Sequence, residues 1–94
     1  MKIRAIPARK PRSLLLKIGF EEEAGKDHVF FYFRYVGRIV VRAKISHGAK
    51  EIDQPVLGLM GKQLKLKRKN FEEFLRGELS REDYIGILRE LEVI

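Results

Sequence analysis

One histidine opens an aromatic, arginine-bearing segment in the first half of the chain. His28 begins the run His-Val-Phe-Phe-Tyr-Phe-Arg-Tyr, and Lys26 and Asp27 come directly before it. Imidazole is the one side chain whose unperturbed pKa allows it to take up and release a proton near neutral pH. Lysine and arginine bind phosphate. A histidine close to such cations suits chemistry on a phosphodiester, so RNA or DNA is the first partner to consider.

The chemistry expected of His28 is that of a general base. It would take the proton of a ribose 2′-hydroxyl, which then attacks the adjacent phosphorus and leaves a 2′,3′-cyclic phosphate. This reaction needs no metal, and general acid–base catalysis contributes about 10²–10⁴-fold to a rate. The developing charge would need Lys26, Arg34 or Arg42 nearby. The alternative is a structural histidine that only hydrogen-bonds Asp27 or the backbone.

A second histidine, His47, follows the second basic segment of the chain. It is either the acid partner of His28 or a loop histidine whose hydrogen bonds are made to the backbone. The chain has two histidines and no cysteine. Because thiolate ligands are absent and the histidines are not part of a carboxylate cluster, we expect neither a metal site nor a cofactor.

Two β-strands are expected to position these side chains, at residues 28–35 and 38–45. The first is rich in aromatic residues and the second in β-branched residues, as strands are. Val36 and Gly37 between them suit a tight hairpin, because glycine tolerates a positive φ. Alternation puts Ile39 with the core residues of the second strand and Arg38 on the other face. That other face is expected to mix aromatic and cationic side chains, namely Phe30, Tyr32, Arg34, Arg42 and Lys44.

This mixed face has two interpretations. Proteins that bind single-stranded nucleic acid combine aromatic stacking surfaces with flanking cations. Aromatic residues of a strand can equally be buried beneath helices, and Tyr32 is consistent with either role. On the first interpretation, the nucleic-acid-binding residues are Lys26, Tyr32, Arg34, Arg38, Arg42 and Lys44.

Helices are expected before and after these two strands along the chain. The first spans residues 11–19, and a brief strand over residues 20–23 follows it. Asp53 is a suitable N-cap for a second helix that ends near residue 64. Residues 65–69 form a basic connector, the pair Asn70 and Glu73 predicts a short helix that ends at Gly77, and Ser80 caps the last helix. The expected fold is α+β, a three-stranded antiparallel sheet with two helices on one face and further helices at the C-terminal end.

The charge of the chain is unevenly distributed. Residues 1–50 hold 12 Lys and Arg against 4 Asp and Glu, a net charge of +8, whereas residues 51–94 hold 8 against 9, a net charge of −1. A positive field on one half of a small domain points to a polyanionic partner. The alternative explanation is that these charged residues form a Lys- and Glu-rich surface of the kind that thermophilic proteins have. No apolar run reaches membrane-spanning length, so we expect a single cytoplasmic domain that does not contact membranes.

Several motifs, in this order, resemble the HicA family of small toxin ribonucleases between about residues 11 and 67. They are "LLLKIGFEE", the lysine-containing turn with His28 opening an aromatic strand, the Gly37-Arg38 hairpin, "HGAKEI", and a helix that ends in "GKQLKL". The resemblance implies a fold like that of double-stranded-RNA-binding domains. It also implies metal-independent cleavage of mRNA by one histidine, here His28, and restraint by a HicB-type antitoxin. Residues 70–94 would be a helical extension of this core.

Two other functions remain open. The chain could keep the fold and its basic face as a nucleic-acid-binding module without catalysis. Alternatively, it could be a protein–protein adaptor, or a homodimer, built around the C-terminal helices, where Tyr84, Leu88 and Leu91 form an apolar stripe.

Overall fold

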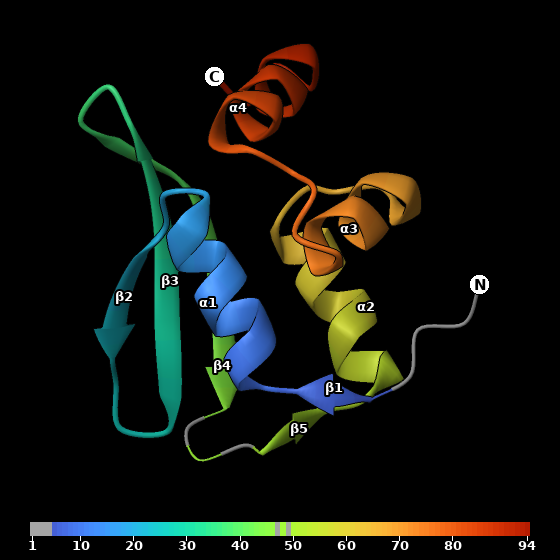
Figure 1. Cartoon of the computed structure of the whole chain (residues 1–94). Coiled ribbons are helices and arrows are strands. Elements are labelled where there is room, and N and C mark those ends of the chain that lie inside the picture. The colour runs from blue at the N-terminus through green and yellow to red at the C-terminus, as the bar shows by residue number, and fades with distance from the viewer. Residues whose placement is uncertain (1–4, 47, 49) are drawn as a thin grey trace.

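The computed structural model describes residues 5–46, 48 and 50–94. Over this part of the chain, helices and strands form an α+β fold (Figure 1). In chain order the elements are β1 (Ile6–Pro7), α1 (Arg9–Lys17), β2 (Glu21–Ala24), β3 (His28–Tyr35), β4 (Arg38–Ser46), β5 (Glu51–Ile52), α2 (Gln54–Gln63), α3 (Arg68–Leu75) and α4 (Arg81–Glu90).

The three longer strands form an antiparallel sheet in the order β2-β3-β4, and β1 pairs with β5 in a separate two-stranded sheet. The strand predicted at residues 28–35 is confirmed as β3, and β4 extends one residue beyond the predicted 38–45. Val36 and Gly37 join them with φ angles of 49° and 77°. Positive φ at both central positions is the geometry of a type I′ turn, whose twist matches that of the strands. The predicted hairpin is therefore confirmed.

A bulge interrupts the pairing of β3 with β4 and leaves Val40 without a directly opposed partner. An extra residue in one strand reverses the alternation of its side chains beyond that point. Arg34 is consequently opposite Ile39, and Tyr35 is opposite Arg38. Because directly opposed residues share a face, Ile39 lies on the face of Arg34 and Arg38 on the face of Tyr35. The predicted faces of Ile39 and Arg38 are thus wrong.

One face of the sheet packs against helices. Away from the hairpin end, the side chains that β3 and β4 place on this face are buried, with exposed fractions from 0% for Phe31 and Phe33 to 6% for Val29. In Figure 1, α1 lies in front of β3 and β4, and α2 lies beside β4, which it contacts. Leu15 of α1 and Leu57 of α2 belong to the same buried cluster. The predicted two-helix cover is therefore confirmed. Among the residues that the structure describes, no helix packs on the opposite face of the sheet, which we call the open face.

The helices that follow the sheet differ in part from prediction. Asp53 caps α2 as expected, with its Oδ1 accepting a hydrogen bond from the Val56 amide at 3.3 Å. In contrast, α3 begins at Arg68 rather than after Asn70, and no side chain caps it. The predicted basic connector is therefore shorter, since Arg68 and Lys69 lie within the helix. At the start of α4, Ser80 and Asp83 form a capping box, as predicted for Ser80.

The last helix inserts an aromatic side chain into the core. Tyr84 is fully buried, its ring meets Phe33 edge-on at 5.1 Å between centroids, and its hydroxyl donates to the Leu64 carbonyl at 2.8 Å. Burial raises the pKa of the Tyr84 phenol above its ordinary value. Leu88 is also fully buried, whereas Leu91 is 46% exposed. The stripe predicted on this helix is therefore core packing at its first two positions.

Candidate nucleic-acid interface

The open face of the sheet is built from two similar rows of side chains, each crossing all three strands. In the first row, Glu23 of β2, Phe30 of β3 and Lys44 of β4 are directly opposed. Their side chains share one face because opposed residues of antiparallel strands point the same way. Each residue in the row is at least partly exposed. The row therefore presents a carboxylate, an aromatic ring and a cation side by side.

The second row repeats the pattern two residues away along the strands. Glu21, Tyr32 and Arg42 are directly opposed, and two residues along a strand span about 6.8 Å. Glu22, between these two glutamates, lies on the other side of the sheet, which faces the helices, and its carboxylate pairs with Arg12 of α1 at 2.7 Å. The two rows thus give the open face an acidic edge on β2, an aromatic centre on β3 and a basic edge on β4.

The aromatic side chains at the centre form a continuous line. The rings of Phe30 and Tyr32 are nearly parallel, with an angle of 11° between their planes and 6.4 Å between their centroids. His28 continues the line at 6.1 Å from Phe30. Parallel, partly exposed rings offer stacking surfaces of one orientation, which is how single-stranded nucleic acid is bound.

The Phe30 ring is held in place by the turn before β3. A Cβ atom at Gly25 would lie 2.7 Å from Cε2 of Phe30 and 2.8 Å from the His28 carbonyl oxygen. Only glycine leaves room for the ring to lie against the backbone at this point. Gly25 therefore lets Phe30 pack beside the end of β2.

The cations of the open face differ in their partners. Arg34 is ion-paired with Glu21, with 3.0 Å between Nε and Oε2, and both side chains are about half exposed. Arg42 and Lys44 are exposed and lie on either side of Ala43 beside a shallow concavity of about 210 Å³, which Phe30 and Tyr32 also line. These two cations of β4 are accordingly the ones best placed to hold phosphate beside the aromatic line.

The other predicted site residues are not all brought into this group. Arg38 lies on the opposite face at the hairpin end of the sheet. Lys26 is exposed in the turn next to His28. His28 and Arg34 are both in β3, six residues or about 20 Å apart, so they cannot act on one phosphate. His47 lies outside the described residues.

Besides Ile39, three residues at the open face were not identified from the sequence. Glu21 and Glu23 join it only because of the register in which β2 pairs with β3. Gln63, at the end of α2, lines the same concavity, and its Oε1 accepts a hydrogen bond from the Lys44 amide at 3.3 Å. Alternation along "FEEE" could have grouped the two glutamates, but nothing in the sequence links Gln63 to β4.

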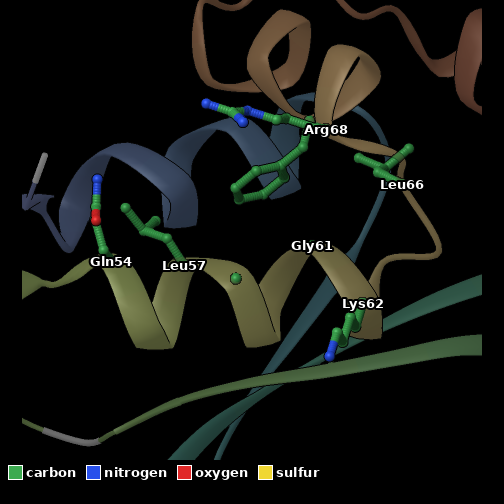
Figure 2. A pocket seen from close by; sticks show the side chains of 8 residues that line it. Gln54, Leu57, Gly61, Lys62, Leu66 and Arg68 are labelled. Atoms are coloured by element: carbon green, nitrogen blue, oxygen red, sulfur yellow. The ribbon is translucent and has the colours of Figure 1, made fainter. Parts of the chain in front are cut away.

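A second concavity, of about 400 Å³, lies between α2 and α3. Figure 2 shows Gln54 and Leu57 projecting from α2 on the side over which Arg68 extends from the start of α3, whereas Lys62 extends away from Arg68. Its lining combines apolar side chains with two exposed cations. This groove is a separate place at which an anionic partner could bind, and it lacks the row of exposed rings.

Comparison of the chain with family models, curated proteins and solved structures finds no match. The resemblance to HicA toxins therefore stays a hypothesis that rests on the sequence motifs alone. Within residues 5–46, 48 and 50–94, no three His, Asp or Glu side chains are grouped as ligands for a metal ion. In the same part of the chain, no helix combines the length and the apolar composition needed to cross a membrane.

Proposed function

We propose that the chain binds single-stranded RNA on the open face of its sheet. The observation that carries this proposal is the line of half-buried rings on β3, with the exposed cations Arg42 and Lys44 beside it on β4. Bases of a single strand would stack on Phe30 and Tyr32, and the phosphates would follow β4. Base–aromatic stacking contributes about 1–3 kcal/mol per base, and cations along the backbone add a salt-dependent term.

A single strand fits this face better than a duplex does. The bases of a double helix are stacked on one another, so an exposed protein ring has no base face to contact. Double-stranded RNA is instead recognised by its shape, through the 2′-hydroxyls and phosphates. A face with partly exposed rings at its centre and exposed cations at one edge therefore favours unpaired bases.

The experiment is a titration of labelled RNA octamers, single-stranded and fully paired, followed by fluorescence anisotropy at several salt concentrations. We expect the single strand to bind at least about tenfold more tightly than the duplex, since each of two stacked bases contributes more than 1 kcal/mol. We also expect Arg42→Gln to reduce the slope of log K against log salt by about 0.7, the value for one lost phosphate contact. Equal or tighter binding of the duplex would contradict the proposal.

A second candidate function is cleavage of the bound strand by His28. The observation that favours it is the position of His28 at the end of the aromatic line, half-buried and opposite Ser46. An RNA strand that lies on Phe30 and continues along β3 would bring a ribose close to this imidazole. On β4, the cation closest to His28 is Lys44, which is two residues from Ser46, the residue opposite His28. In the proposed reaction, which needs no metal, His28 takes the proton of the 2′-hydroxyl, and the 2′-oxygen attacks the adjacent phosphorus. The bond from phosphorus to the 5′-oxygen of the next nucleotide breaks, and this oxygen leaves after it takes a proton from water.

Cleavage is tested by incubating single-stranded RNA with the protein in EDTA, beside the His28→Ala variant. If His28 is the base, the variant should cleave about 10²–10⁴-fold more slowly while retaining RNA affinity, and the products should end in 2′,3′-cyclic phosphate. Circular dichroism would establish that the two proteins are equally folded. Equal cleavage by both proteins would exclude His28 from the reaction, and cleavage by neither would leave binding as the function.

A further inference from the structure

The acidic edge of the open face is unexpected for a surface that binds a polyanion. Glu23 is exposed and directly opposite Phe30, on the side of that ring away from Lys44. Residues opposed in this way have Cβ atoms about 4.5–5.5 Å apart. Unlike Glu21, which is ion-paired with Arg34, Glu23 has no ion-pair partner among the residues that the structure describes. A carboxylate thus lies beside the Phe30 ring with no ion-pair partner in the described part of the chain.

The row defines how a nucleotide would be oriented. Phosphate is attracted to Lys44 and repelled by Glu23, so the backbone of the strand should follow β4. A base stacked on Phe30 then points its Watson–Crick edge across β3 toward β2, where it meets Glu23. Recognition of unpaired bases on that edge by hydrogen bonds is the usual source of sequence preference in RNA binding.

The chemistry of the carboxylate determines which base it accepts. An ionised carboxylate only accepts hydrogen bonds, through two oxygens. The Watson–Crick edge of guanine presents two adjacent donors, the N1–H and the 2-amino group, which match those two oxygens. Cytosine and adenine each present one amino group there. Uracil flanks its single N3–H with two carbonyl oxygens, which a carboxylate repels.

We propose that Glu23 is a specificity-determining residue that selects guanine at the nucleotide stacked on Phe30 and rejects uracil. This inference rests on the proposed binding of single-stranded RNA. It adds an orientation, with the backbone along β4 and the base edge toward β2. It also gives the acidic edge a role, because a carboxylate beside bound RNA would otherwise only weaken the complex.

The test uses labelled octauridine and the same octamer with one central guanosine or one central inosine. Inosine keeps the N1–H of guanosine and lacks its 2-amino group. We expect the wild-type protein to bind the guanosine octamer roughly 5- to 150-fold more tightly than octauridine, the range for a good bidentate contact to a base. The inosine octamer should fall between them. In Glu23→Gln the ratio of the guanosine and uridine affinities should fall to within about threefold of unity, because the amide also donates to uracil oxygens.

The matched control is Glu22→Gln, which removes the same charge from the neighbouring position of β2 but on the helix-covered side, where Glu22 pairs with Arg12. It should keep the wild-type ratio. Because the ratio is the readout, a general gain in affinity from losing a negative charge does not affect it. If the wild-type protein binds all three octamers tightly and equally, the inference about Glu23 is wrong and RNA binding stands. If it binds none of them, the proposed function itself is wrong, and the inference falls with it.

Discussion

Replacing Phe30 or Tyr32 by alanine is expected to weaken binding of single-stranded RNA by about 5- to 150-fold each. This range corresponds to the loss of one base–aromatic stack, about 1–3 kcal/mol. Both rings lie on the open face, nearly parallel and 6.4 Å apart, so each would carry its own base. The affinity of the double variant should fall by a factor close to the product of the fold losses of the two single variants. Anisotropy titrations with one octamer, at one salt concentration, measure all three variants.

The matched control for these variants is Leu16→Ala. Leu16 is 47% exposed on α1, which covers the other face of the sheet. The Leu16→Ala variant removes a partly exposed apolar side chain and leaves the aromatic line unchanged. Its RNA affinity should therefore stay within about twofold of wild type. An equal loss of affinity in Leu16→Ala and Phe30→Ala would show that the effect is not specific to the open face.

Tyr84→Ala is expected to lower the free energy of unfolding by about 3–5 kcal/mol, the cost of truncating a large buried aromatic residue. Tyr84 is fully buried against Phe20 and Phe33, with ring centroids 5.7 and 5.1 Å away. Since domains of this size are stable by about 5–15 kcal/mol, the loss is a large share of the total. Urea denaturation followed by circular dichroism gives the change directly.

Tyr84→Phe separates the hydroxyl from the ring. It keeps the aromatic packing and removes the donor to the Leu64 carbonyl, for an expected loss of about 1–3 kcal/mol. Because burial raises the pKa of the phenol, the stability linked to its protonated form is present below the ordinary value of about 10 and is lost as the pH rises above it. The result that would contradict this account concerns Tyr84→Ala. If that variant had the same urea midpoint of unfolding as the wild-type protein, α4 would not contribute to the stability of the core.

The strands and their buried face were predictable because alternation of side chains is a local property. The aromatic run at residues 28–35 and the β-branched run after it could pair only through the Val36-Gly37 turn. The bulge at Val40 was not predictable, since no residue type marks it. The bulge is seen only in the register with which β4 pairs with β3, and it moves Arg38 away from the open face.

The helix boundaries show a second limit of the sequence. Ser80 and Asp83 form the capping box of α4, but the similar pair Asn70 and Glu73 lies inside α3, whose N-cap Lys67 makes no side-chain cap. A capping motif is one of several ways to begin a helix, because water can also satisfy the first amides. The sequence alone therefore placed the start of α3 three residues late.

The candidate site was predictable only in part, for a related reason. Tyr32, Arg42 and Lys44 share the open face as alternation requires. The contribution of Glu23 depends on the register between β2 and β3, and that of Gln63 on how α2 packs against β4. Both depend on contacts between segments far apart in the chain, which no local pattern contains.

The measurement that tests the central claim most directly is an NMR titration of the ¹⁵N-labelled chain with a single-stranded RNA octamer. Binding on the open face predicts that the largest changes in amide shifts lie in β3 and β4, around Phe30, Tyr32 and Lys44, and in the facing residues of β2. Changes confined to the groove between α2 and α3, around Gly61 and Arg68, would contradict this account and place the RNA on the helices instead.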